Sequence, residues 1–438
     1  MKILSLSLAG LLLLALLFGF FYLQKPVENG LEPLPTSSHS EILLVGDPFA
    51  YSIQNQLDLL REGLGLPLRL SVRRYNRTYE TILANHRDQE SYFHLVSFDI
   101  LWLPELAEKG ILQPLSTEEL ENFGFVPEDH HQITLDLNTH DGQLFGLPIQ
   151  PHPELLWYRR DLLDEHGFDP PQNTEELLKQ AAALHDPENQ FFGIGWNALR
   201  GQALGQTVTH LYAAFGGPVI NSQGYAAVDT EVGREMSAFL LELRQSSPPD
   251  ILSMAWDQRI ERFTRGQSAF TYGWMARNRA AERDPLSMVK GKVGYLQPPP
   301  APGLEPAVPM GQWSLGIPAN LSPREREKAI KTLVYLVSDE ADQILFADGF
   351  HGHHRKRGNV VTQKLKNDPG YQIVYDLLSK GNISPEARPM IPEWAEVADI
   401  LGIVFHDMLR GDISVESALR RGQREIETLL EQGKAPSP

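Results

Sequence analysis

The apolar positions that follow residue 40 alternate between strand and helix spacing. Glu41–Val45 is a short apolar run and Leu68–Val72 alternates apolar with polar residues, so both are typical of strands. Between them, the apolar residues of the range 53–64 recur at helical spacing. A second helical pattern surrounds Tyr79–Leu83, and His94–Phe98 has the pattern of a third strand. This β–α–β–α–β order predicts a parallel, doubly wound α/β sheet.

Residues that begin and end helices extend the α/β pattern along the chain. A capping residue is followed by glutamate three positions later at Ser116, Asn173 and Ser322. Gly110 suits the position that ends a helix over 102–109. The stretch 297–309 is rich in proline and predicts a rigid connection. Because no internal repeat is visible, two α/β lobes are the most economical packing of these elements.

Composition and charge exclude several functional classes. The 438 residues contain no cysteine, which excludes disulfide scaffolds, thiol nucleophiles, Cys-ligated zinc and iron–sulfur clusters. The net charge is −17, from 39 basic and 56 acidic residues, whereas contact with phosphate backbones needs surplus Lys and Arg. We therefore expect no nucleic-acid partner and no cofactor.

The N-terminus carries an apolar segment. Ile3–Leu23 holds no charged residue and is long enough to span a bilayer, which needs about 20 residues. A small-x-small cleavage site is missing behind it, so we expect an uncleaved anchor, with a cleaved signal peptide as the alternative. Under either interpretation we expect the rest of the chain to be exported. Residues 1–24 are then the anchor or signal, and residues 25–40 a semi-extended linker.

Five sequence blocks resemble one protein family. Asp99 and Trp102, followed by Gly110, Leu112 and the Pro114-Leu115 pair, are similar to the family block D-x-x-W…G-x-L-x-P-L. The blocks occur in the family's order and cover 97–115, 146–163, 166–177, 263–274 and 311–318. Together they resemble family 1 extracellular solute-binding proteins, the sugar-capturing components of ABC importers related to maltose-binding proteins. The stretch 193–202 further resembles members that bind small sugars or polyols.

The resemblance implies a periplasmic-binding-protein-like type II fold. It has two doubly wound α/β lobes with an interlobe cleft. The expected N-terminal lobe comprises residues 41–149 and 312–356, and the C-terminal lobe comprises residues 150–311 and 357–438. Ligands of open α/β sheets bind outside the carboxyl ends of strands, which here border the cleft.

A sugar site needs aromatic platforms for the ring faces and carboxylates, amides or arginines for the hydroxyls. Residues of these types occur where the resemblance places the edges of the cleft. A glycine among them would allow close backbone approach to a ligand. The candidate ligand-binding residues are Asp47, Tyr51, Asp99, Trp157, Tyr158, Arg200, Trp274, Gly311, Gln312, Trp313 and Arg355.

Several of these candidates have a purely structural alternative. Asp99 fits the N-cap of the helix that follows it, and one residue can fill both roles. Trp102 and Trp157 are as easily core residues, because buried tryptophan usually packs. Arg200 could form a surface ion pair, and Asp47 could close a turn beside proline.

The segment His351–Arg357 carries three histidines and a basic run. Such histidines could ligate zinc or copper, but carboxylates are missing nearby and the run Arg355–Arg357 would repel a cation. We therefore expect no metal site and instead a ligand-facing or solvated basic loop. If this loop faces the cleft, an anionic sugar derivative becomes a candidate ligand.

The leading functional hypothesis is a periplasmic or other extracytoplasmic binding protein for carbohydrate transport. It captures a sugar, polyol or sugar derivative and delivers it to ABC transporter permease subunits, and the segment 3–23 anchors it to the inner membrane. A membrane-tethered ligand sensor or accessory subunit with the same fold is the alternative. An exported glycan-active enzyme is a third reading, disfavoured because no paired catalytic carboxylates and no G-x-S-x-G or H-E-x-x-H motif occur. We therefore expect no catalytic residues.

Overall fold

The computed structural model describes residues 40–350 and 352–433. The predicted anchor, the linker up to residue 39 and His351 lie outside the described residues. Within the two described ranges, no helix combines the length and the apolar character that crossing a membrane requires.

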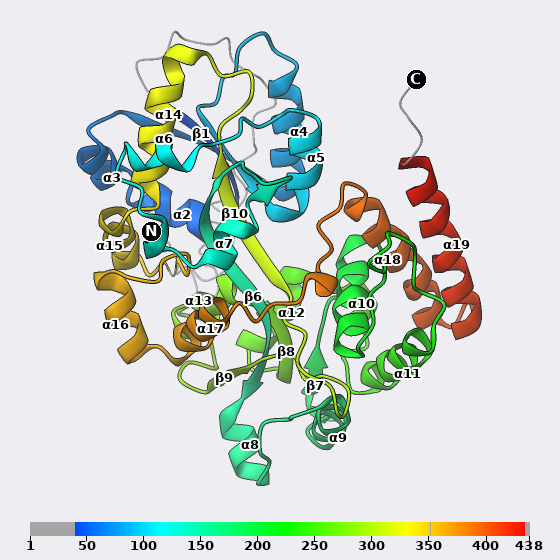
Figure 1. Cartoon of the computed structure of the whole chain (residues 1–438). Coiled ribbons are helices and arrows are strands. Elements are labelled where there is room, and N and C mark those ends of the chain that lie inside the picture. The colour runs from blue at the N-terminus through cyan, green and yellow to red at the C-terminus, as the bar shows by residue number, and fades with distance from the viewer. Residues whose placement is uncertain (1–39, 351, 434–438) are drawn as a thin grey trace, which may run out of the picture. The chain divides into compact units, whose positions relative to one another are not determined.

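Seven strands form a continuous mixed sheet, and an eighth strand pairs beside it (Figure 1). Their order is β2 (Leu68–Arg73), β1 (Ser40–Val45), β3 (Leu95–Asp99), β10 (Met310–Gly316), β6 (Leu147–Arg159), β8 (Ser268–Trp274) and β7 (Phe192–Gly195), and β9 (Val293–Leu296) also pairs with β6. β1 is parallel to β2 and β3, which confirms the predicted parallel start of the chain. β10 is antiparallel to both β3 and β6, so the middle of the sheet is mixed.

β6 joins the two parts of this sheet. Its first residues, 147–153, pair with β10, and residues 154–158 pair with β8. In Figure 1, β10 and β6 run side by side through the middle of the fold. We call β2, β1, β3 and β10 the first strand group, and β8, β7 and β9 the second strand group. Polar side chains near residues 153 and 154 of β6, where its pairing partner changes from β10 to β8, therefore lie between the two groups.

The helices that follow the first strand depart from the predicted pattern in one respect. The single helix expected over 53–64 is two helices, α2 (Pro48–Asn55) and α3 (Leu57–Leu64), which are separated at Gln56. Ile53 and Leu60 are both fully buried, so apolar spacing continues across the break and could not reveal it. The next predicted helix is α4 (Tyr75–His86), which buries Ile82.

Two of the three predicted helix caps form their side-chain hydrogen bond. Ser116 accepts from the backbone N–H of Glu119 at the start of α6 (Thr117–Glu121), and Asn173 accepts from that of Glu176 at α9 (Thr174–Ala183). Ser322 precedes α14 (Pro323–Leu336) without such a bond. This helix starts with proline, whose missing N–H and fixed φ suit the first helical position. The proline-rich stretch 297–309 connects β9 to β10 without strand or helix, as expected.

β4 (Thr139–His140) and β5 (Gln143–Leu144) pair in a separate two-stranded sheet. Further helices are η1 (Ile100–Trp102), α5 (Leu103–Glu108), α7 (Gln132–Asp136), α8 (Arg160–His166), α10 (Gln202–Ala214), α11 (Glu231–Gln245), α12 (Trp256–Thr264), α13 (Asn278–Glu282), α15 (Asp339–Ala347), α16 (Asn359–Asn367), α17 (Pro369–Lys380), α18 (Trp394–Arg410) and α19 (Val415–Gly433).

Separate hydrophobic cores cover the two strand groups. One core lies around Phe98 and Leu315 of the first group. A second core contains Trp196 and Phe405, and helices α10 and α18 contribute to it. These two helices touch closely, because a Cβ placed on Gly205 would lie 1.8 Å from the backbone oxygen of Ala398. Glycine is therefore required where they cross.

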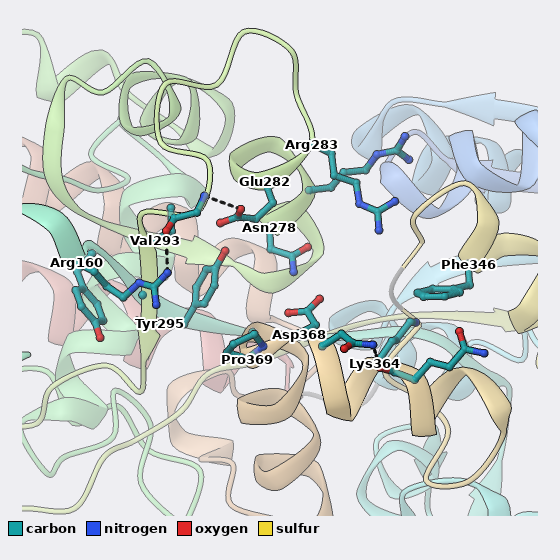
Figure 2. Close-up of a pocket in the computed structure, with 17 residues that line it drawn as sticks. Arg160, Asn278, Glu282, Arg283, Val293, Tyr295, Phe346, Lys364, Asp368 and Pro369 are labelled. Carbon is teal, nitrogen blue, oxygen red and sulfur yellow. Dashed lines mark hydrogen bonds between the residues drawn. The ribbon is translucent and has the colours of Figure 1, made fainter.

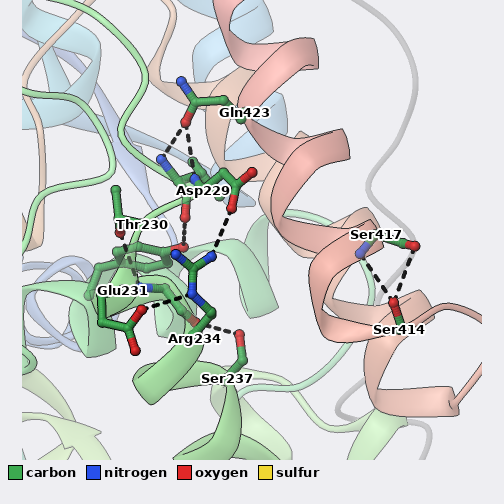
Figure 3. A network of polar contacts seen from close by, with 11 residues as sticks. Asp229, Thr230, Glu231, Arg234, Ser237, Ser414, Ser417 and Gln423 are labelled. Atoms are coloured by element: carbon green, nitrogen blue, oxygen red, sulfur yellow. Dashed lines mark hydrogen bonds and ion pairs between the residues drawn. The ribbon is translucent and has the colours of Figure 1, made fainter.

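The C-terminal helix α19 is held by a polar network (Figure 3). The Gln423 side-chain oxygen accepts from the backbone N–H groups of Val228 at 2.7 Å and Asp229 at 3.1 Å. Thr230 caps α11, and Arg234 on that helix is ion-paired with Asp229 at 3.1 Å. These contacts hold α19 against the second core.

Candidate functional site

Aromatic rings gather near the carboxyl ends of β3 and β8 and along β10, which pairs with both β3 and β6. The Trp313 ring lies 5.8 Å from that of Tyr75, 6.3 Å from that of Trp102 and 6.1 Å from that of His152. The rings of His152 and His210 lie 5.4 Å and 5.8 Å from that of Trp274, both edge-on. We define the central cluster as Asp47, Tyr75, Asp99, Trp102, His152, Glu154, His210, Trp274, Trp313 and Arg388.

Strand register brings these side chains together. Trp313 of β10 stands opposite Asp99, the last residue of β3. Glu154 of β6 stands opposite Trp274, the last residue of β8. Gly311 stands opposite His152, and a Cβ there would lie 2.5 Å from the Nε2 atom of His152. Glycine at 311 therefore makes room for the imidazole between the two tryptophans.

Asp99 is the first of three buried acidic groups in the cluster. Its Oδ2 accepts from Arg388 Nη2 and from the Tyr75 hydroxyl, each at 3.1 Å. Its Oδ1 accepts from the backbone N–H of Leu101 at 3.3 Å, which caps η1. Arg388 also lies over the face of Trp274, 5.1 Å from its centroid. The aspartate therefore caps a helix and pairs with a buried cation at the same time.

Asp47 is the second acidic group and lies just after β1. It accepts a hydrogen bond from the indole N–H of Trp313, and its other oxygen lies 3.1 Å from Arg277. Arg277 also lies 3.2 Å from Asp257 at the start of α12. This arginine thus links the first strand group to a helix beside the second strand group.

Glu154 is the third acidic group and is 3% exposed. Arg259 pairs with one of its oxygens, and the Nδ1 atom of His210 lies 2.6 Å from the other. Burial alone would raise the pKa of Glu154, but Arg259 and His210 outweigh it and lower this pKa to about 2. All three acidic groups of the cluster therefore have a basic partner.

Burial favours the neutral form of both histidines of the cluster. Burial lowers the pKa of His152 and that of His210, although neighbouring acidic groups oppose the shift. His152 Nδ1 lies 2.7 Å from the carbonyl oxygen of Gln150, so this nitrogen carries the proton. In the same way, His210 Nδ1 donates to Glu154, which leaves Nε2 as a bare acceptor.

Several buried polar atoms around the cluster lack a hydrogen-bond partner among the described residues. They are His210 Nε2, Gln206 Nε2, Arg388 Nε and the hydroxyl oxygen of Tyr272. Gln206 and His210 are four residues apart on α10, and Tyr272 precedes Trp274 by two residues on β8, so each pair shares a face. An unsatisfied buried polar group costs about 1–3 kcal/mol. Hydroxyl groups of a bound molecule would satisfy these atoms.

The structure brings five of the eleven predicted residues to this place. Four belong to the central cluster: Asp47, Asp99, Trp274 and Trp313. The fifth is Gly311, which lies against it. Tyr51 lies nearby, 53% exposed, and a Cβ on Gly46 would lie 3.2 Å from its hydroxyl.

The other five predicted residues lie elsewhere. Gln312 is buried and its amide donates to the carbonyl of Thr134, because alternate residues of β10 face opposite sides. Trp157 is fully buried beside Phe263 in the core, as the structural alternative described.

Tyr158 is half-buried at a separate pocket (Figure 2). Arg200 lies 3.3 Å from Asp407 and half its side chain is exposed. Arg355 is buried and pairs with Asp129 at 3.1 Å, so its guanidinium does not face the central cluster.

Six members of the central cluster are absent from the list of candidate ligand-binding residues, although Trp102 was weighed as a cleft or a core residue. They are Tyr75, Trp102, His152, Glu154, His210 and Arg388. Trp102 lies inside a motif block, and the crossover segment after Gly146 contains His152 and Glu154, so both signals were available. Arg388 lies in a short loop segment after η6 (Pro385–Ala387), and its long-range pairing with Asp99 leaves no local pattern.

Comparisons with known proteins bear on the family and the fold of the chain. The family model of the bacterial extracellular solute-binding protein matches residues 94–343. The mannitol-binding protein of Pseudomonas aeruginosa is 22% identical over 77% of this chain and 80% of its own length.

Solved structures are similar as well. A solute-binding protein of an Agrobacterium radiobacter ABC transporter, solved with ribitol, is 25% identical. It covers 91% of this chain and 100% of its own, with a TM-score of 0.78. MalE3 of T. maritima, solved with maltose, has a TM-score of 0.74 at 22% identity, over 89% of this chain and all of its own. These likenesses confirm the predicted α/β fold of the periplasmic-binding-protein-like type II class.

Proposed function

Because the chain belongs to the bacterial extracellular solute-binding protein family, we propose that its central cluster binds a neutral polyol or sugar for delivery to an ABC transporter. The observation that carries this proposal is the composition of the cluster. It places the buried rings of Trp274 and Trp313 beside buried polar atoms that lack partners among the described residues. Aromatic faces and hydrogen-bonding groups are what a polyhydroxylated ligand requires.

The paired charges favour an uncharged ligand. Asp47, Asp99 and Glu154 each have a basic partner, so an added charge would disturb an existing pair. Arg355, which prompted the idea of an anionic ligand, is already paired with Asp129. Ribitol and maltose, found in structures similar to this one, are both neutral.

The proposed capture involves two lobes, residues 41–149 with 312–356 and residues 150–311 with 357–438. Ion pairs already join residues of the two proposed lobes, at Asp99–Arg388 and at Asp348–Arg279, each 3.1 Å long. A ligand held between tryptophans of both groups would favour the closed arrangement by its better affinity for that state. We further propose that the segment 3–23 tethers the exported protein to the membrane, which N-terminal sequencing of the exported protein tests.

A thermal-shift panel tests the ligand class on the full chain. Ribitol, D-mannitol, D-tagatose and maltose represent neutral ligands, and D-glucuronate represents a charged one. We expect at least one neutral compound to raise the melting temperature and to lose this effect in Trp274→Leu, whereas any effect of D-glucuronate should persist in that variant. A response to D-glucuronate alone, or to none of the five, contradicts the proposal.

A matched pair of variants locates the site. Gln206→Ala removes a side chain whose Nε2 lacks a partner in the described structure and whose Oε1 accepts one 3.3 Å hydrogen bond from the Trp256 indole, so folding loses little while a ligand contact is lost. Gln245→Ala removes an exposed glutamine at the end of α11. The active compound should stabilise the Gln245→Ala variant fully and the Gln206→Ala variant less. Equal stabilisation of both variants would place the ligand elsewhere.

A further inference from the structure

A pocket of about 580 Å³ lies apart from the central cluster (Figure 2). Its walls come from β9, from α13 and from the segment where α16 ends and α17 begins. Phe346 of α15 and Tyr158 and Arg160 beside the end of β6 complete the lining. None of its lining residues belongs to the central cluster, so a molecule bound here would be a second ligand.

Buried hydrogen-bonding groups face this pocket. Asn278 is 5% exposed, and in Figure 2 its amide points toward the same space as Tyr295 and Asp368. The hydroxyl oxygen of Tyr295 is buried and lacks a hydrogen-bond partner among the described residues. Burial therefore raises the pKa of Tyr295 well above its usual range, and the phenol remains a donor.

One end of the pocket is cationic. The Lys364 ammonium is buried without a hydrogen-bond partner in the described ranges and lies 5.1 Å from the centroid of the Phe346 ring. Burial lowers the pKa of Lys364 to about 8, a shift that Asp342 and Asp368 oppose and Arg283 reinforces. Arg283 lies beside Gly349, because a Cβ on that glycine would meet its guanidinium.

The remaining charges of the pocket are engaged in contacts of their own. Arg279 pairs with Asp348 at 3.1 Å, and Arg160 donates to the carbonyl of Gly291 at 2.9 Å. Glu282 accepts from the backbone N–H of Gly291 at 3.0 Å. Lys364 and Arg283 are therefore the lining cations that make no ion pair and no side-chain hydrogen bond among the described residues. Asp342 and Asp368 are the acidic groups that act on Lys364.

We propose that this pocket is a second ligand site, which binds a small oxyanion between Arg283 and Lys364. The guanidinium and the ammonium both favour the planar or tetrahedral oxygens of carboxylate and phosphate groups. Asn278 and Tyr295 then donate to hydroxyls on the same molecule, and Asp368 can accept from them. The ligand class is accordingly a hydroxylated organic acid or a phosphate, in contrast to the neutral ligand of the central cluster.

Calorimetric titration of the full chain tests this site with two probes, gluconate and inorganic phosphate. Gluconate carries a carboxylate with hydroxyls, and phosphate carries the tetrahedral oxyanion alone. Comparison of the two probes therefore shows whether the pocket prefers a hydroxylated carboxylate or a phosphate. We expect saturable binding of at least one probe. Absence of saturable binding for both overturns the proposal.

Three variants tie the binding to the pocket. Arg283→Gln removes an exposed cation and should weaken binding about tenfold, the loss expected for a charge-assisted hydrogen bond. Asn278→Asp keeps the side-chain size but adds a negative charge and should weaken binding further. Lys380→Gln removes an exposed charge at the far end of α17 and should bind the probe like the unmodified chain. Unchanged affinity in both pocket variants overturns the proposal.

A variant of the central cluster separates this site from the proposed function. Trp274→Leu should abolish stabilisation by the neutral ligand and leave gluconate or phosphate binding intact. If Trp274→Leu instead removes oxyanion binding, the probe binds in the central cluster and the second site is refuted.

Discussion

Asp99 shows how one side chain serves both local structure and the site. Its position after a strand predicts a helix cap or a ligand contact. The structure shows the cap through Leu101 and, on the other oxygen, a buried pair with Arg388. The ion pair joins residues far apart in sequence, so no local pattern could reveal it. Contact of Asp99 with ligand remains a prediction.

The Asp99–Arg388 pair should be costly to break. Asp99→Asn keeps the shape but leaves the Arg388 guanidinium, 8% exposed, without its countercharge. Removing one partner of a buried pair costs about 3–5 kcal/mol, so urea unfolding should show a loss of that size. Adding Arg388→Met to the Asp99→Asn variant should recover part of the lost free energy of unfolding, because the second substitution removes the unpaired charge.

A matched substitution controls for loss of a carboxylate in general. Asp164→Asn, on the exposed face of α8, should change the free energy of unfolding by less than about 0.5 kcal/mol. If Asp99→Asn costs no more than this control, the buried pair contributes nothing to stability.

Buried histidines should make stability depend on pH. Burial lowers the pKa of His131 to about 4, whereas the unperturbed value is 6.5. Between pH 6.5 and pH 4 the unfolded chain therefore binds a proton at this histidine that the folded chain does not. The contribution of neutral His131 to the free energy of unfolding is complete above pH 6.5 and is lost as the pH falls toward 4. His131→Asn should reduce the loss of unfolding free energy between pH 7 and pH 5 by about 2 kcal/mol.

Urea unfolding at both pH values measures this difference. His166→Asn, at the exposed end of α8, is the matched control and should leave the pH dependence unchanged. An equal pH dependence in His131→Asn and in the unmodified chain would falsify the role given to this histidine.

At the scale of elements, sequence patterns predicted the features that depend on residues close together in the chain. The parallel pairing of β1 with β2 and β3 follows from alternating strand and helix spacing, and the caps at Ser116 and Asn173 follow from residue type. The break at Gln56 and the length of β6 were not predicted. Both depend on contacts between distant segments, which periodicity does not record.

The same limit applies to the site. Trp274 and Trp313 were chosen from motif positions, and the structure places them with Asp47 and Asp99. The motif position of Trp157 and the basic run around Arg355 also predict ligand contacts, but Trp157 packs in the core and Arg355 pairs with Asp129. The side of the sheet that Trp157 faces depends on strand register, and the partner of Arg355 depends on a contact between distant segments. Neither is visible in the local sequence.

The crossing of α10 and α18 should tolerate no side chain at Gly205. In Gly205→Ala the added methyl group would meet the backbone of Ala398, which cannot move without shifting α18. Overpacking of this kind costs about 1–3 kcal/mol. Thermal unfolding should therefore show a clear decrease in the melting temperature.

Gly422→Ala is the matched control, because that glycine lies in α19 and its Cβ would meet only a side-chain atom of Val228 at 3.3 Å. Replacing a helical glycine by alanine there should be neutral or stabilising, by up to about 1 kcal/mol. If both variants behave alike, the close helix crossing is not what limits residue 205.

At the scale of the whole molecule, the central cluster draws its members from both strand groups. Asp99 and Trp313 come from the first strand group, and Trp274 from the second. β6 contributes His152 and Glu154 from the point where its pairing changes from β10 to β8. A ligand that contacts both tryptophans would therefore couple binding to the arrangement of the two groups.

Calorimetric titration of the full chain with the most stabilising neutral compound of the panel tests this account most directly. We predict one saturable binding event per chain, lost in Trp274→Leu and unchanged in Arg283→Gln, which lies at the separate pocket. Absence of binding heat, or equal affinity in Trp274→Leu and the unmodified chain, would contradict a solute site at the central cluster.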